Sequence, residues 1–198
     1  MVARRFGSAD AYSACVDESY GGSIEDLARV RIATEKPILA KDIIVDPIQI
    51  ALSAEKGASA VLLIASVLGS RLEDLMDSAT LVGVEAAVEV HTPNECRFAL
   101  NAGATLLVVN NRDRLDGQLH SDQALYVRDL IPPNVVAVAA GGIDSLAAAR
   151  RLALAGYDGV MVGRKLLTAG DPAFASALRD VQVTPVDHFL PPRFDGDE

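Results

Sequence analysis

Short apolar runs recur along the chain roughly every 24 residues, in the range expected of repeated supersecondary units. Most of the runs are rich in Val, Ile, Leu and Ala, which suits parallel strands buried on both faces. The seven runs are DAYSACV at 10–16, KPILAKDIIV at 36–45, SAVLLIASVL at 59–68, VEAAVEV at 84–90, ATLLVVN at 104–110, VVAVAA at 135–140 and YDGVMVG at 157–163. The pattern therefore predicts seven parallel strands.

Amphipathic segments with helix start and stop signals separate these runs. Ser23 and Ser70 open the capping-box spacings SIED and SRLE, and Asp46 and Thr92 each stand before a proline. Glycines at 57, 103 and 156 follow the segments that they would terminate. The chain thus alternates strand and helix, which calls for right-handed crossovers and a parallel sheet.

A parallel sheet of this kind is either open and doubly wound or closed into a barrel. No glycine-rich fingerprint of the dinucleotide-binding type follows the run at 10–16. Polar residues instead follow strand after strand, as in a barrel whose chemistry gathers at the carboxyl ends of its strands. We therefore expect an α/β fold of the (β/α)8 TIM type. Such barrels usually need about 250 residues, so this chain is expected to lack the first strand–helix unit. We expect one domain over 1–182 and a loosely ordered tail over 183–198.

Composition and charge limit the classes of molecule that the chain is expected to bind. Half of the 198 residues are hydrophobic and the net charge is −9, which argues against nucleic acid or an anionic membrane and leaves room for a small anionic substrate. No long apolar span or leader-like segment is evident, so a cytoplasmic protein is expected. Cys15 and Cys96 form no CxxC, and the three histidines are scattered, so no metal site is predicted.

Two ionisable residues interrupt the apolar strands. Lys41 stands near the end of the second run and Glu89 lies inside AAVEVHT. Burying either charge without a partner is costly, so each is a candidate partner of the other. At the mouth of a barrel Lys41 could serve as an acid, base or cation. The alternatives are a lysine that reaches solvent beside Asp42 and a purely structural ion pair.

Later strand ends carry binding chemistry. In VVNNRDR, Asn110 could orient a hydroxyl and Arg112 could hold a carboxylate in a fork. The last two strands end in AAGGIDS and VGRKLL, where glycines let backbone N–H groups approach a ligand. Barrels often bind phosphate at these two loops. The predicted substrate-binding residues are Asn110, Arg112, Gly141, Gly142, Gly163 and Arg164.

Together, the stretches GGSIEDLARVR, KPILAKDIIVDPIQI, AVLLIASVL, VEVHTPNE, LLVVNNRD, GGI and GVMVG resemble the indole-3-glycerol phosphate synthase family of tryptophan biosynthesis. The resemblance implies a lyase that closes the ring of an anthranilate-derived deoxyribulose phosphate with loss of carbon dioxide and water, without a cofactor. It implies that Lys41 is the general acid and that Glu89 belongs to the catalytic network. It also implies that Asn110 and Arg112 contact substrate and that Gly142 and Gly163 offer backbone N–H groups to phosphate.

Two departures from the family pattern affect the expected activity. The family carries an opening strand with a catalytic lysine, which this chain does not show, and it usually reads SESGI where this chain has AAGGI. Ala140 therefore stands at a glutamate and Gly141 at a serine. Three interpretations stay open: a synthase homologue with weakened activity, a related barrel recruited to another cyclisation or lyase step, and a non-catalytic binding or oligomerising homologue. A seven-stranded barrel also predicts a homo-oligomer, or a terminal segment, that covers its open edge.

Overall fold

The computed structural model describes residues 5–113, 117–120 and 122–182. The predicted tail at 183–198, with His188, lies outside the described residues. The strands are β1 Tyr12–Cys15, β2 Ile38–Lys41, β3 Ala60–Ile64, β4 Glu85–Val90, β5 Leu106–Asn110, β6 Val136–Ala140 and β7 Gly159–Met161. The α-helices are α2 Ile24–Ala33, α3 Pro47–Glu55, α4 Ala65–Leu68, α5 Leu72–Val82, α6 Pro93–Asn101, α7 Gln123–Arg128, α8 Leu146–Leu154, α9 Arg164–Ala169 and α10 Pro172–Arg179. Two 3-10 helices, η1 Glu18–Tyr20 and η2 Gly69–Arg71, complete the elements.

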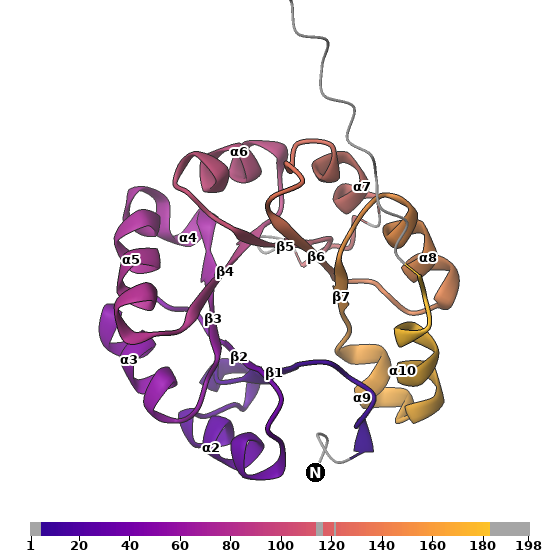
Figure 1. Cartoon of the computed structure of the whole chain (residues 1–198), viewed down its shortest axis with the longest axis horizontal. Helices are drawn as coiled ribbons and strands as arrows, with labels where there is room; N and C mark the ends of the chain where they lie inside the picture. Colours follow the sequence, from indigo (N-terminus) through magenta and orange to yellow (C-terminus); the bar gives the residue numbers. More distant parts are fainter. Residues whose placement is uncertain (1–4, 114–116, 121, 183–198) are drawn as a thin grey trace, which may run out of the picture.

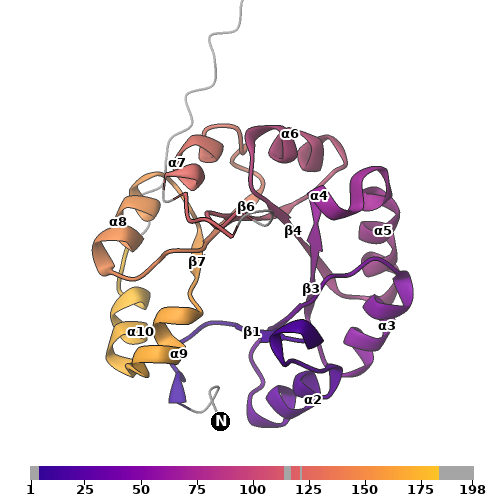
Figure 2. The ribbon, with the colours of Figure 1, turned by 180° about the vertical axis from the view of Figure 1, so that it is seen from behind.

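The strands form one parallel sheet in the order β1-β2-β3-β4-β5-β6-β7, so each strand pairs with its neighbours in the sequence. The sheet curls into an incomplete ring with the helices around its outside (Figure 1; Figure 2). The predicted parallel α/β sheet is confirmed. Within the described residues β1 and β7 do not pair, so the ring stays open between them.

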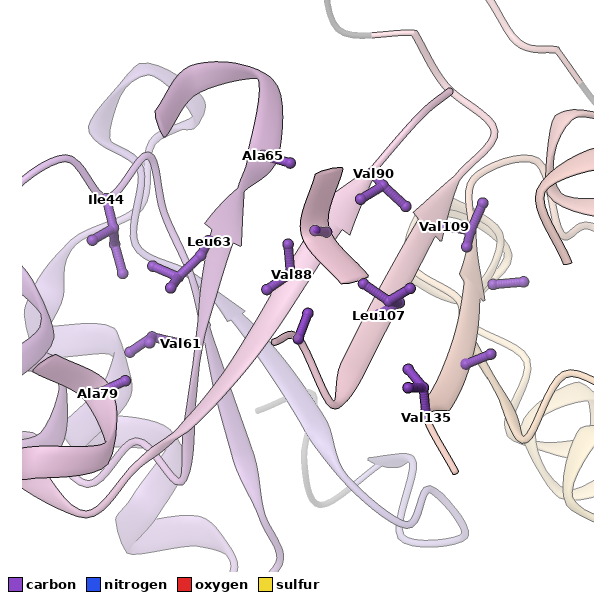
Figure 3. Packing of buried hydrophobic residues seen from close by; sticks show 14 of the residues in the cluster. Ile44, Val61, Leu63, Ala65, Ala79, Val88, Val90, Leu107, Val109 and Val135 are labelled. Atoms are coloured by element: carbon purple, nitrogen blue, oxygen red, sulfur yellow. The ribbon is translucent and has the colours of Figure 1, made fainter. Parts of the chain in front are cut away.

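Alternating residues of each strand point to opposite sides of the sheet. Val61, Leu63, Val88, Leu107 and Val109 point outward into a large core beneath the helices (Figure 3). The inward positions form a second, smaller cluster, whose buried members are Leu62, Ile64, Ala87, Val108 and Ala140. Both faces of the sheet are therefore apolar, which explains the nearly continuous apolar runs in the sequence.

Most of the predicted helix boundaries are confirmed. Asp46 caps α3 through the N–H of Ile48, and Thr92 caps α6 through the N–H of Glu95. The carboxylate of Asp26 accepts the backbone N–H of Ser23, as the SIED spacing predicts. The SRLE prediction is wrong, because η2 occupies Gly69–Arg71 and α5 begins only at Leu72, without a side-chain cap.

The residues before β1 lie across the opening between β1 and the last helices (Figure 1). Phe6 is 4% exposed, and its carbonyl accepts a hydrogen bond from the hydroxyl of Tyr12. The guanidinium of Arg5 donates to the carbonyl of Gly170, and Asp10 lies 3.4 Å from Arg179 of α10. This segment therefore ties β1 to the far side of the opening. In the described residues, no helix is long and apolar enough to cross a membrane.

Candidate functional site

Three polar side chains meet at the carboxyl ends of β2, β4 and β5. The alternation that turns Leu62, Ala87 and Val108 inward also turns Lys41, Glu89 and Asn110 inward, above these apolar residues. Lys41 Nζ lies 3.4 Å from Glu89 Oε2, and Asn110 Nδ2 donates to the same oxygen at 3.3 Å. The predicted catalytic residue Lys41 on β2 and the predicted binding residue Asn110 on β5 thus both contact the Glu89 carboxylate on β4.

The two members of the ion pair differ in their exposure. The Glu89 side chain is 4% exposed, whereas the Lys41 side chain is 42% exposed. Asp42 does not take up the Lys41 charge, since its carboxylate accepts Gln49 Nε2 at 3.4 Å. The ion pair that Lys41 makes in the described residues is with Glu89 and not with Asp42. Lys41 reaches solvent and Glu89 at once, which leaves the ammonium free to meet a ligand.

A histidine that the sequence left isolated belongs to the same cluster. His91 is 6% exposed, and its Nε2 lies 3.4 Å from Glu89 Oε1, at ion-pair distance but without the alignment of a hydrogen bond. On the other side of the ring, Nδ1 lies 3.1 Å from Glu95 Oε2, which also accepts the His91 backbone N–H at 2.8 Å. The signal for this group was the HTPNE spacing, because a glutamate at the third position of a helix reaches back past the cap.

Opposite charges dominate the titration of this cluster. Burial opposes ionisation of all three groups, but the interactions among them outweigh it. The carboxylates of Glu89 and Glu95 raise the pKa of His91 from 6.5 to about 9. In return, His91 and Lys41 lower the pKa of Glu89, and His91 lowers that of Glu95. At neutral pH Glu89 and Glu95 are therefore carboxylates and His91 between them is an imidazolium.

A small cavity opens beside the cluster. Its volume is about 110 Å³, and it is lined by His91, Thr92, Asn110, Asn111, Asp113, His120 and Gln123. All of these side chains are polar. Asn110 thus contacts both Glu89 and the cavity, so a hydroxyl-bearing ligand in this space would meet an amide positioned by β5.

The structure does not bring the Arg112 guanidinium to the Lys41–Glu89 pair. Arg112 Nη1 donates to the carbonyl of Gly117 at 2.7 Å, and its backbone N–H donates to Asn110 Oδ1 at 3.0 Å. Asn111 has a structural role, since it bonds to the N–H of Ala124 and to the carbonyl of Gly141. In this structure Arg112 therefore orients Asn110 through its backbone, and its side chain stays on the following loop.

The two adjacent glycines after β6 are required by their surroundings. Gly141 has φ +82°, and an added Cβ would lie 2.6 Å from Asn110 Oδ1. Gly142 has φ +70°, and an added Cβ would lie 2.7 Å from a methyl group of Leu119. Any larger residue at either position would be strained in its backbone and would collide with the neighbouring loop.

The end of β7 is open by comparison. Gly163 precedes α9 with φ −110°, and no atom lies within 4 Å of an added Cβ. Arg164, the first residue of α9, is exposed. Among the described residues the amides of Gly142 and Gly163 donate no hydrogen bond to another backbone group. Because Ala140 pairs with Met161 in neighbouring parallel strands, Gly142 and Gly163 both lie just beyond the carboxyl ends of those strands.

The chain resembles proteins of known function. A model of the indole-3-glycerol phosphate synthase family matches residues 2–178. Indole-3-glycerol phosphate synthase of Mycolicibacterium gilvum is 39% identical over 173 residues, which make up 86% of this chain and 64% of that protein. The corresponding protein of Exiguobacterium sibiricum is 37% identical over 185 residues, 91% of this chain and 72% of that one. Indole-3-glycerol phosphate synthase 2 of Streptomyces coelicolor is 40% identical over 168 residues, 84% and 65% of the two chains.

The chain spans about two thirds of the length of these relatives. Among solved structures, it is similar to orotidine 5'-phosphate decarboxylase from Pyrococcus horikoshii OT3, with a TM-score of 0.69 over 90% of both chains. That likeness comes with 19% sequence identity, so it bears on the fold alone.

Proposed function

Because the chain belongs to the indole-3-glycerol phosphate synthase family, we propose that its site closes the indole ring of an anthranilate-derived deoxyribulose phosphate. One carbon–carbon bond forms, the anthranilate carboxylate leaves as carbon dioxide and the ketone oxygen leaves as water. The meeting of Lys41, Glu89 and Asn110 carries this proposal. The names of the matching relatives favour it over a recruited barrel or a non-catalytic homologue.

Each side chain of the cluster has a role in this reaction. Lys41 donates a proton to the oxygen that leaves as water, because its ammonium is partly exposed while its Nζ lies 3.4 Å from Glu89 Oε2. Glu89 accepts a proton from the substrate and holds Lys41 between turnovers. Asn110 orients a substrate hydroxyl from the wall of the cavity. Arg112 would need to leave the carbonyl of Gly117 before it could contact substrate.

The phosphate group binds at the ends of β6 and β7. The amides of Gly142 and Gly163, which donate to no other backbone group in the described part of the chain, provide backbone donors, and Arg164 adds a positive charge near the same end of the sheet. Gly141 lets the β6 loop pass close to Asn110, and a serine at this position would strain that approach. The binding end of the site therefore depends on backbone groups more than on side chains.

We also propose that the seven strands correspond to strands two to eight of an eight-stranded (β/α)8 barrel. The lack of strand pairing at the outer edges of β1 and β7 within residues 5–113, 117–120 and 122–182 supports this correspondence. A cytoplasmic location is proposed as well, and the free thiols of Cys15 and Cys96 support it, since a reducing compartment keeps such groups unpaired.

Turnover is expected to be slow. Ala140 is 5% exposed and faces the inner cluster at the end of β6, where the family usually has a glutamate. A missing proton-transfer group typically costs about 10²–10⁴-fold in rate. Substrate binding should survive better than catalysis, because the phosphate contacts do not depend on Ala140.

Two assays on the purified protein test this function. Titration calorimetry with a reduced, non-reacting substrate analogue should show binding that inorganic phosphate competes for. Fluorescence of the indole product should show slow formation that the Glu89→Gln variant abolishes. Binding without any product would leave a phosphate-binding homologue, and the absence of both would remove the proposed function altogether.

A further inference from the structure

His91 joins the cluster from a position that the proposed reaction does not use. It follows Glu89 by two residues and stands one residue beyond the end of β4 at Val90, so its side chain projects to the same inner side as that of Glu89. Glu95 holds the ring from the first turn of α6, since one carboxylate oxygen accepts both the backbone N–H of His91 and its Nδ1. This double contact fixes the orientation of the imidazole and directs Nε2 toward Glu89.

The positions of the two carboxylates set the protonation state of the ring. A neutral imidazole has one N–H and one lone pair, so it can donate to one carboxylate only. Here Glu89 faces one ring nitrogen and Glu95 faces the other, at 3.4 and 3.1 Å. A lone pair near a buried carboxylate would be repelled, whereas an imidazolium donates to Glu95 and places its positive charge beside Glu89. The arrangement thus alternates in charge from Glu95 through His91 and Glu89 to Lys41.

We propose that His91, clamped by Glu95, is a positioning residue that orients the Glu89 carboxylate and keeps it ionised when Lys41 turns toward a ligand. Lys41 is partly exposed and makes a long contact to Glu89, so it can move away at little cost. Without a second cation, a carboxylate as buried as Glu89 would then be uncompensated. His91 remains in place because Glu95 and the β4–α6 connection hold it.

Other charged groups surround this arrangement without replacing His91. Asp113 and His120 line the cavity on the side of the β5–α7 connection, and Lys41 reaches Glu89 from β2. On α6 itself, Glu95 is the group that faces the ring. The catalytic part of this inference rests on the proposed synthase function, whereas the contact itself does not. The experiment therefore has one arm that needs no turnover.

The first arm is a pH titration by nitrogen-15 NMR of the protein labelled in histidine, with the His91 signal assigned by loss in His91→Gln. In the intact chain His91 should keep both ring protons at neutral pH and titrate near pH 9. Glu89→Gln and Glu95→Gln should each lower the midpoint by about one pH unit or more. A midpoint at or below 6.5, or one that ignores Glu89→Gln, would overturn the proposal. This arm decides the contact even if the protein turns over no substrate.

The second arm compares kinetics in His91→Gln and Glu95→Gln. A displaced catalytic group can cost about 10²-fold, so His91→Gln should lower kcat by about that factor with little change in KM. The acidic limb of the kcat/KM profile should move to higher pH, because Glu89 loses its lasting cationic partner. Glu95→Gln keeps the imidazole and should show a smaller effect in the same direction. The exposed Glu73→Gln on α5 serves as the matched control. If both variants fold and keep the parent's kcat and pH profile, His91 has only a structural role and does not position Glu89 for catalysis.

Discussion

Lys41 of β2 and Glu89 of β4 lie 3.4 Å apart and are separated by the whole of β3. On the intervening strand, Ile64 pairs with Glu89 in the sheet register and faces inward. The curl of the sheet makes this contact possible, since it brings next-but-one strands together at the inner face. The Lys41–Glu89 ion pair at the carboxyl ends of the strands therefore depends on the curvature of the sheet.

Replacing Lys41 by Met should separate catalysis from stability. Product formation should fall by about 10²–10⁴-fold, as for other lost proton-transfer groups. The urea midpoint should change little, because the lysine is 42% exposed and His91 still compensates Glu89. Lys56→Met, which removes a surface pair with Glu25 outside the site, is the matched control. Parallel losses of activity and stability in Lys41→Met would identify a structural pair instead.

Stability should fall as pH rises through the titration of His91. The pKa of His91 is higher in the folded chain, about 9 against 6.5, so its contribution is complete below pH 6.5 and is lost toward pH 9. Glu89 and Glu95 have lowered pKa values, so their contributions are present above about pH 4.5 and are lost in acid. Urea unfolding at several pH values between roughly 6 and 9, the interval in which His91 titrates, measures how the free energy of unfolding changes with pH. His91→Gln should flatten this dependence, and an equal slope in that variant would assign the effect elsewhere.

Introducing a carboxylate at the end of β6 should raise turnover. Ala140→Glu places an acidic group on the inner face, one strand from Asn110, with which Ala140 pairs. We expect about a tenfold or greater increase in kcat, within the range that acid–base groups provide. Crowding in the inner cluster should lower stability by about 1–3 kcal/mol. Ala140→Gln, which has nearly the same size and no charge, separates the two effects, and an equal gain from it would rule out proton transfer.

The glycines of the phosphate end should respond differently to alanine. Gly141→Ala should cost about 1–3 kcal/mol of unfolding free energy, because φ is +82° and the new Cβ would meet Asn110. Gly163→Ala should leave stability nearly unchanged, since its Cβ would enter open space at φ −110°. That methyl group should nevertheless weaken inorganic phosphate binding in calorimetry. Full phosphate affinity in Gly163→Ala would place the anion elsewhere.

The segment before β1 should control association at the open edge. Phe6 is 4% exposed, and its removal in Phe6→Ala should destabilise the chain by about 3–5 kcal/mol. Detachment of this segment would expose the edges of β1 and β7, which invites pairing between chains. Light scattering after size-exclusion chromatography should therefore show larger species for Phe6→Ala than for the exposed control Tyr20→Ala. A variant that is destabilised but keeps the parent's mass distribution would contradict this role for the segment.

The local features of the fold were determined by sequence alone. The strands at the apolar runs, the helix caps at Asp46 and Thr92, and the order of strands and helices were predicted correctly, because each depends on residues close together in the sequence. Lys41, Glu89 and Asn110 were selected from the same runs, since an isolated polar group in an apolar strand needs a partner. The SRLE prediction failed because a 3-10 turn at Gly69–Arg71 absorbed the candidate cap.

Tertiary structure decided which of these groups meet. Both faces of each strand are apolar, so the sequence could not show that Lys41 and Glu89 share the inner face. The turn of Arg112 toward Gly117 and the contact of His91 with Glu89 depend on how loops and helices pack at the mouth of the sheet. The opening between β1 and β7 is likewise a property of the whole sheet. Periodicity reports which side chains are buried, whereas the distance between charges on separate strands is set by the curvature of the assembled sheet.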